Sequence, residues 1–117
     1  MANLTAKPRS SDVNAPEWVD QSPIVHVQGE SYTHSLTWLG ATTVTVSGVT
    51  IYRGTTDVTA TNMPAGSHSA SGNVATFKPL TALVGNTTLI IVFTCTVDGN
   101  TEIRKLRAEV KLPLAAQ

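Results

Sequence analysis

One stretch of sequence, TLIIVFTCTVDGNTEIRKLRAEVKL at residues 88–112, constrains the fold of this 117-residue chain more than any other. Its first half is apolar on both alternating faces, which is typical of a central strand that is covered on both sides. The DGN sequence at residues 98–100 is a strong signal for a tight β-hairpin turn. The last quarter of the sequence is therefore predicted to be one long antiparallel ribbon.

The return strand of this ribbon shows an irregularity in its hydrophobic alternation. Ile103 has one parity, and the apolar residues beyond it have the other: Leu106, Ala108, Val110 and Leu112. A change of parity inside a strand indicates a β-bulge, so we predict one at Arg104-Lys105. Beyond this bulge, four side chains are expected to face solvent or a partner: Lys105, Arg107, Glu109 and Lys111.

From residue 23 onward the sequence is typical of short β-strands. No helical period appears, and threonine, which suits pleated surfaces, occurs 18 times in the chain. Besides the final ribbon, the predicted strands are residues 23–28, 32–39, 42–54, 55–59, 67–70 and 74–77. The parity break at Ser47-Gly48 predicts a bulge, and residues 61–67 are predicted to be a loop. The chain is thus predicted to be all-β, an immunoglobulin-like antiparallel β-sandwich of about seven strands over residues 23–113, with a tail at residues 114–117.

Residues 1–22 differ from the rest of the chain in composition. They are rich in proline, serine and asparagine, and no period of 2 or 3.6 persists through them. This composition favours an extended N-terminal arm over a part of the core. We expect the arm to dock onto the domain or onto a neighbouring chain, with Trp18 as its anchor.

The charge pattern limits the possible partners. Eight basic and eight acidic residues give zero net charge, which argues against general nucleic-acid binding. Charged residues make up 14% of the chain against a typical ~25%, as expected of a protein that packs among partners or of one that uses hydroxyls instead. We expect no membrane partner and no secretion, because the sequence has neither a long apolar segment nor a signal-peptide pattern.

Few residues could form a reaction centre. His26 and His34 face each other, with Cβ atoms about 5 Å apart, if residues 29–31 form a three-residue turn. Two histidines could hold a metal, but a site needs more ligands, so a simple cross-strand pair is the favoured interpretation. No nucleophile, phosphate-binding or metalloprotease motif is present, and Cys95 lies in an apolar run that predicts a buried, inert thiol. We therefore predict a non-enzymatic protein without metal or cofactor.

Two segments carry a family resemblance: VSGVTIYRGTTDVTATNMPAG at residues 46–66, and PLTALVGNTTLIIVFTCTVDGNTEIRKLRAEVKL at residues 79–112. Together with the polar arm KPRSSDVNAPEWV and the SLTW strand at residues 35–38, they resemble the small immunoglobulin-like virion proteins of tailed bacteriophages. The resemblance covers roughly residues 13–112 and consists of strand spacing and turn residues. The long segment between Asp57 and Phe77 departs from the family pattern, which leaves open the position in the virion.

The resemblance implies a non-enzymatic structural component of a bacteriophage virion, assembled in the host cytoplasm. It would dock onto neighbouring virion subunits through its arm, as capsid decoration or as a head–tail or fibre adaptor, with several copies in the assembly. Removal of residues 1–20 would then leave the sandwich folded. The contact residues that we expect are Arg9, Val13, Trp18, Arg104, Lys105 and Arg107.

Two other functions remain open at the level of sequence. A surface adhesin or carbohydrate-binding module would stack sugars on exposed aromatic rings, and Tyr52 points away from the core residue Ile51. A domain of a larger secreted bacterial assembly is the third possibility, which the missing signal pattern disfavours.

Overall fold

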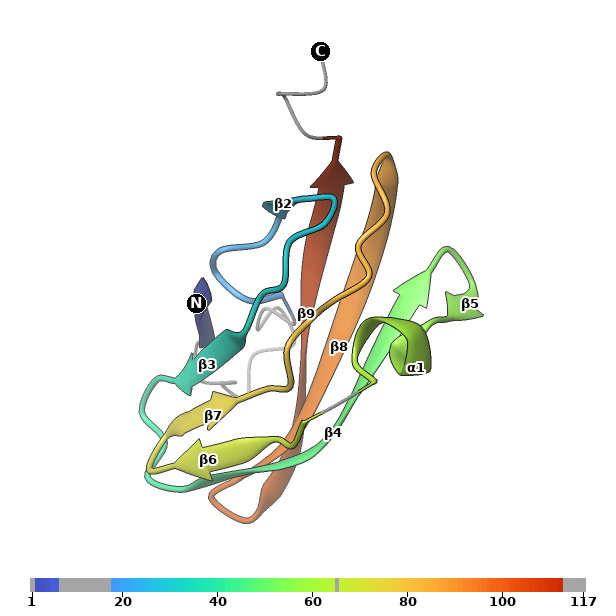
Figure 1. The fold of residues 1–117 in the computed structure, drawn as a ribbon. Helices are drawn as coiled ribbons and strands as arrows, with labels where there is room; N and C mark the ends of the chain where they lie inside the picture. Colours follow the sequence, from blue (N-terminus) through green and yellow to red (C-terminus); the bar gives the residue numbers. More distant parts are fainter. Residues whose placement is uncertain (1, 7–17, 65, 113–117) are drawn as a thin grey trace.

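The computed structural model describes residues 2–6, 18–64 and 66–112. These residues form two β-sheets packed face to face in a sandwich (Figure 1). The smaller sheet has the order β1 (Ala2–Ala6), β3 (His34–Trp38), β7 (Val74–Thr76) and β6 (Ser69–Ser71). The larger sheet has the order β2 (Ile24–Val27), β9 (Asn100–Lys111), β8 (Thr87–Val97), β4 (Val44–Arg53) and β5 (Thr56–Asp57). The all-β prediction and the two-layer sandwich are therefore confirmed.

The β8–β9 ribbon forms the centre of the larger sheet, as predicted. Asp98 and Gly99 make the two-residue turn, with φ values of 48° and 87°. Pairing runs without a shift from Thr87 opposite Val110 to Val97 opposite Asn100, so the prediction of a bulge at Arg104-Lys105 is wrong. The hydrophobic alternation of β9 looked broken in the sequence because one inward-facing position is held by a charged residue. Arg104 points inward like Leu106 and is fully buried.

The bulge predicted in β4 is confirmed. The register between β4 and β8 shifts between Val46 and Gly48, where Val46 lies opposite Cys95 and Gly48 opposite Thr94. The extra residue restores the inward direction of the apolar side chains, so Ile51 is fully buried.

The N-terminal segment is part of the fold rather than a free arm. β1 pairs in parallel with β3, and Leu4 and Ala6 are 2% and 0% exposed. Val19 is 3% exposed, and the backbone N–H of Asp20 donates to the Thr5 carbonyl at 2.9 Å. The boundary expected at residue 22 does not separate these residues from the sandwich, because Leu4, Ala6 and Val19 are buried in the core.

The core lies between the two sheets. Phe77 and Phe93 stack across it with ring centroids 4.4 Å apart, and Trp38 is 2% exposed. The connection before β8 buries Leu80 and Leu83. The segment predicted to be a loop begins with a single helical turn, α1 (Thr59–Asn62). Within the described ranges, no helix is long and apolar enough to cross a membrane.

Candidate interaction surface

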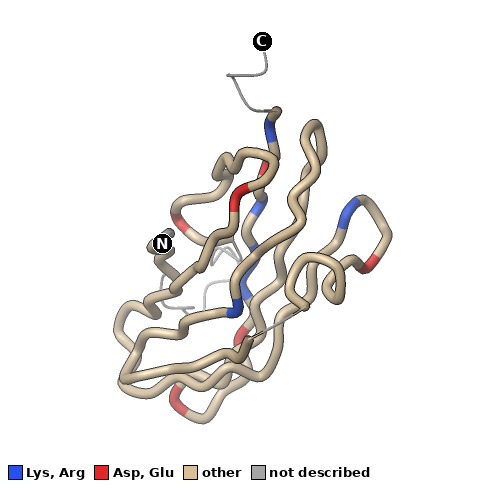
Figure 2. Tube along the Cα trace, viewed as in Figure 1, with Lys and Arg blue, Asp and Glu red and all other residues tan. Residues whose placement is uncertain are grey.

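The outward-facing side of the larger sheet brings together apolar and basic side chains. Strand register places Tyr52, Ile90 and Arg107 in one cross-strand row. The next row contains Thr50, Val92 and Lys105. Figure 2 shows that basic residues gather along β9, the strand that also carries Glu102 and Glu109. We call these two rows, with Trp18 and Ile103 at their margin, the outer face.

Apolar side chains of the outer face remain in contact with solvent. Ile90 and Val92 are half-buried in the middle of the sheet, and Ile103 is 44% exposed. Tyr52 is 37% exposed, in agreement with its predicted outward direction. The sequence predicted a β8 strand covered on both faces, and the structure buries one of the two: Leu89, Ile91, Phe93, Cys95 and Val97.

Trp18 lies beside β9, as part of the segment that leads into β2. Its backbone forms a parallel bridge to Lys105, and the N–H of Val19 donates to the Lys105 carbonyl at 3.0 Å. The Lys105 ammonium lies 5.9 Å from the centroid of the Trp18 ring, which is 39% exposed. A cation near an aromatic face is favourable, so the pair is held at the margin of the outer face.

The other four expected contact residues differ in their location. Arg107 is exposed on the outer face, and its backbone N–H donates to the Ser22 hydroxyl at 3.0 Å. Arg104 is 0% exposed and lies inside the sandwich, so it is not among the residues presented at the surface. Arg9 and Val13 lie outside the described residues.

His26 and His34 form a buried contact between the two sheets. The predicted cross-strand pair is wrong, because β2 and β3 belong to different sheets. His26 and His34 are 2% and 0% exposed, and their Nε2 atoms are 3.0 Å apart. Burial lowers the pKa of His34 to about 4, with the charge of His26 as a second cause. No group of three or more metal-ligating side chains occurs among the residues that the structure describes.

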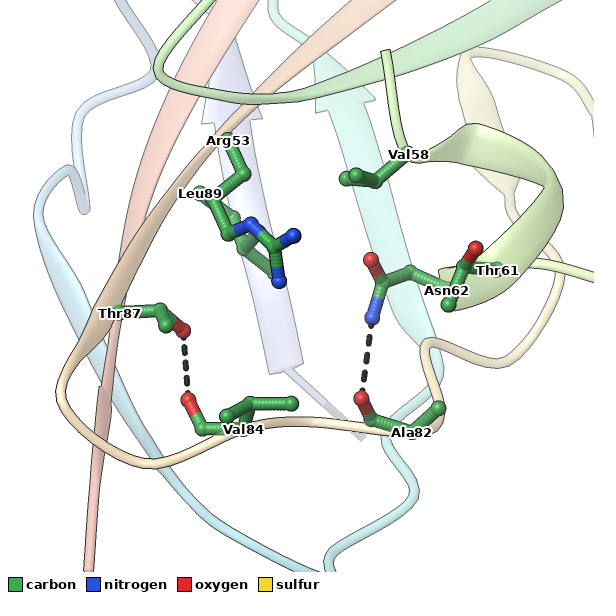
Figure 3. Close-up of a pocket in the computed structure, with 8 residues that line it drawn as sticks. All are labelled: Arg53, Val58, Thr61, Asn62, Ala82, Val84, Thr87 and Leu89. Carbon is green, nitrogen blue, oxygen red and sulfur yellow. Dashed lines mark hydrogen bonds between the residues drawn. The ribbon is translucent and has the colours of Figure 1, made fainter. Parts of the chain in front are cut away.

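A small hollow lies where β4, α1 and the loop before β8 meet (Figure 3). Its volume is about 70 Å³, enough for a few water molecules or one small polar group. Arg53 reaches toward it from the end of β4, and Asn62 faces it from α1. The Asn62 amide donates to the Thr81 carbonyl at 2.8 Å, so much of its hydrogen-bonding capacity is used within the fold.

The pKa values of two further groups, Cys95 and Asp98, are shifted by the structure around them. Burial raises the pKa of the Cys95 thiol to about 11, which keeps it protonated and unreactive at neutral pH. Hydrogen bonds lower the pKa of Asp98, chiefly the bond donated by the Thr43 backbone N–H at 2.8 Å. This carboxylate ties the β8–β9 turn to the start of β4.

No protein-family model and no curated protein matches this chain. The surface must therefore be interpreted from its own residues. Sequence reasoning identified Trp18, Lys105 and Arg107, but it did not single out Ile90 and Val92 as contact residues. The sequence did contain a sign of this contact surface, because β8 is apolar on both of its faces. That pattern predicts that the outer side of β8 is also covered, but it does not say by which protein or segment.

Proposed function

We propose that this chain is a non-enzymatic structural component of a bacteriophage virion, an accessory β-sandwich that docks onto neighbouring virion subunits. It would serve as capsid decoration or as a head–tail or fibre adaptor, in several copies. The phage assignment is supported by the sequence resemblance over residues 13–112, and the docking role by the outer face. Because residues 2–6 are built into the smaller sheet, we place the docking contact on the outer face rather than on a free arm.

One observation carries the docking role. Ile90 and Val92 are only partly buried on the central strand of the larger sheet, a position that commonly requires cover when its side chains are aliphatic. Contiguous exposed apolar surface bordered by polar residues is typical of protein–protein contacts. Arg107 and Lys105 border this patch, which favours a partner surface that carries carboxylates.

We also propose that the sandwich is immunoglobulin-like. The order β3-β7-β6 in one sheet and β9-β8-β4-β5 in the other supports this proposal, because it corresponds to the B-E-D and G-F-C-C′ orders of that fold. The parallel pairing of β1 with β3 is a departure, since neighbouring strands in such sheets are mostly antiparallel.

Incorporation into particles tests the proposed function. Virions purified from cells that supply either wild-type protein or the Val92→Lys variant would be compared for bound protein. We expect Val92→Lys and Arg107→Glu to reduce incorporation at least tenfold, because each removes apolar or charge complementarity at the centre of the contact. Circular dichroism and urea unfolding would verify that both variants keep the fold.

Ser69→Lys is a matched control for these variants. Ser69 is exposed on β6 in the other sheet, so a lysine there adds a charge without touching the outer face. Wild-type incorporation of Val92→Lys and Arg107→Glu, or equal loss with Ser69→Lys, would contradict docking through the outer face. Absence of the wild-type protein from purified virions would contradict the virion role itself.

A carbohydrate-binding role is the second candidate, and the exposure of Tyr52 favours it. The Tyr52 ring lies on the outer face beside Ile90, where a sugar could stack on it. Titration with a glycan panel, followed by tryptophan fluorescence, separates the two functions. Saturable binding that is lost in Tyr52→Ala would support the second candidate over the first.

A further inference from the structure

The short edge strand β2 directs two side chains inward: His26, which is buried, and Ile24, which packs partly buried against the core. β2 pairs in parallel with the last part of β9, from Ile24 opposite Ala108 to Val27 opposite Lys111. Of its four residues, His26 is the fully buried one, while Val25 is 59% exposed. An edge strand with so little buried apolar surface is among the first elements to open in a folded protein.

The contact of His26 joins the two sheets. Its partner, His34, lies on β3 of the smaller sheet, and the 3.0 Å between their Nε2 atoms is a hydrogen-bond distance. In such a bond one Nε2 donates its hydrogen and the other accepts with its lone pair, so the accepting ring must be neutral. A proton added to the accepting Nε2 therefore breaks the bond.

Protonation elsewhere on the pair is also unfavourable. Both Nδ1 atoms are buried without a hydrogen-bond partner among the described residues. The accepting ring already carries its hydrogen on Nδ1, so the remaining site for an added proton is the Nδ1 of the donating ring. A proton there would create a buried imidazolium that no hydrogen bond at that atom stabilises.

The surroundings of the pair contain little compensating charge. The Tyr32 ring lies 4.4 Å from that of His26 and 6.2 Å from that of His34. The carboxylate of Glu30, which accepts a hydrogen bond from the Val27 N–H at 2.7 Å, favours a charged His26, and the amino-terminal charge disfavours a charged His34. On β9, the residue opposite His26 is the apolar Val110.

The two charged neighbours of Val110 on β9 do not compensate the pair. Glu109 and Lys111 have the opposite, outward parity, and their side chains pair with each other at 3.6 Å.

We propose that the His26–His34 contact is an acid-sensitive latch, which holds β2 against β9 at neutral pH and releases it when the pair is protonated. Release would leave residues 108–111 of β9 with an open edge, available to pair with another strand. This inference does not depend on the proposed function, since it concerns the fold of the chain alone.

The direction of the pKa shifts agrees with the latch. Burial lowers the pKa of both histidines from 6.5, for His34 to about 4, and for His26 it outweighs the opposing effect of Glu30. Opening of β2 exposes the rings and restores their ordinary affinity for protons. Acidification from pH 6.5 toward 4 therefore favours the open state, while above pH 6.5 the latch is closed.

Amide hydrogen exchange at two positions measures the latch directly. The Gln28 N–H donates to the Lys111 carbonyl at 2.9 Å on the β2 side of β9. The Asn86 N–H donates to the Val110 carbonyl at 2.8 Å on the β8 side. Between pH 7 and 4.5 we expect the protection factor of Gln28 to fall about a hundredfold relative to that of Asn86, as follows from a lowering of the His34 pKa by about 2.5 units.

Variants identify the histidines as the cause. His34→Gln keeps a side-chain donor and acceptor but does not titrate in this range, so the acid-induced loss of Gln28 protection should fall to less than threefold. His68→Gln is the matched control and should retain the full effect, because His68 lies elsewhere, with its Nδ1 accepting from the Lys78 N–H at 3.2 Å. An unchanged Gln28-to-Asn86 ratio in the wild type, or a full acid effect in His34→Gln, would overturn the latch.

A second measurement on the wild-type chain keeps the test decisive if His34→Gln does not fold. Nitrogen-15 spectra of the imidazole rings should show a neutral His34 at pH 5.5. At pH 7 one ring of the pair should be protonated at Nε2 and the other at Nδ1. A charged ring on either residue at pH 7 would overturn the proposal.

Discussion

At the scale of single residues, Arg104 shows how a charged side chain can belong to the core. Its guanidinium lies 4.7 Å from the Trp38 ring centroid and pairs with Glu102 at 3.0 Å. It also donates to the Ile103 carbonyl at 2.9 Å. Arginine suits this position better than lysine because its planar head can stack on an indole while it forms directed hydrogen bonds.

Substitutions of Arg104 separate the contribution of its volume from that of its charge. Arg104→Met keeps most of the volume, and replacement of a buried ion by an apolar residue is often close to neutral, so we expect the free energy of unfolding to change by less than about 1.5 kcal/mol. Arg104→Ala leaves a cavity beneath Trp38 and should cost about 2–4 kcal/mol. Urea unfolding measures both; equal losses would show that the charge, rather than packing, dominates.

At the scale of elements, the glycine of the β8–β9 turn and the glycine of the β4 bulge have different roles. Gly99 completes the β8–β9 turn with φ of +87°, in the region that disfavours side chains. Gly48 lies at the β4 bulge without a positive φ, and a Cβ added there would meet no atom within 4 Å. The first glycine is thus required by backbone conformation, and the second is not.

Alanine at these two positions tests this difference. Gly99→Ala should lower the free energy of unfolding by about 1 kcal/mol or more, because the left-handed conformation strains an L-residue. Gly48→Ala should change it by less than about 0.5 kcal/mol. Thermal or urea unfolding of the two variants gives the comparison, and a larger loss for Gly48→Ala would contradict it.

The N-terminal strand β1 contributes to the stability of the smaller sheet. Leu4 lies opposite Leu36, which is fully buried, and β1 closes the edge of this sheet beside β3. The sandwich therefore depends on residues that the sequence assigned to an arm. Removal of residues 1–20 would take away β1 and Val19 together, so it tests folding rather than docking.

A single substitution measures the contribution of β1. Leu4→Ala should lower the free energy of unfolding by about 2–4 kcal/mol, the usual cost of truncating a buried leucine. Thr5→Ala is a milder neighbouring control, since Thr5 has the opposite parity and is partly exposed. A loss below about 0.5 kcal/mol for Leu4→Ala would indicate that β1 detaches without consequence for the rest of the fold.

At the scale of the whole molecule, the histidine pair couples global stability to pH. The unfolded chain binds protons at its histidines near pH 6.5, whereas folded His34 does so near pH 4. Stability is thus complete above pH 6.5 and falls as the pH drops toward 4. Asp57 and Asp98 have pKa values lowered from 3.8 by hydrogen bonds, from Thr59 and from Thr43 respectively, so their contributions are lost at still lower pH.

We expect the free energy of unfolding to decrease by about 3 kcal/mol between pH 7 and pH 4 because of His34. Urea unfolding at a series of pH values measures this slope. In His34→Gln the slope between pH 6.5 and 4 should be much smaller. A flat profile in the wild type would show that the pair does not resist protonation in the folded state.

The edges of both sheets are also protected at this scale. The outer edge of β1 is partly occupied, because the Thr5 N–H donates to the Gln21 side chain at 2.7 Å. The bulge at Gly48 twists β4, and β2 and β5 are only four and two residues long. Short, bulged or covered edges disfavour uncontrolled strand addition, which suits a protein that docks through a face.

The sequence by itself determined the strands after residue 23, the β8–β9 turn and the bulge in β4. These features are local, since alternation with a period of two and the positive φ of Gly99 depend on neighbouring residues alone. The outward positions of Tyr52 and Arg107 could be read in the same way, from strand parity.

Tertiary structure decided the features that join distant segments. Leu4 reaches its partner Leu36 across 32 positions, and the composition around it indicates an arm, so β1 could not be found locally. Arg104 has the charge of a surface residue, and only its position between Trp38 and Glu102 makes burial favourable. The sequence predicted His26 and His34 as a cross-strand pair of one hairpin, but β2 and β3 belong to different sheets, so the buried 3.0 Å contact exists only because the two sheets pack together.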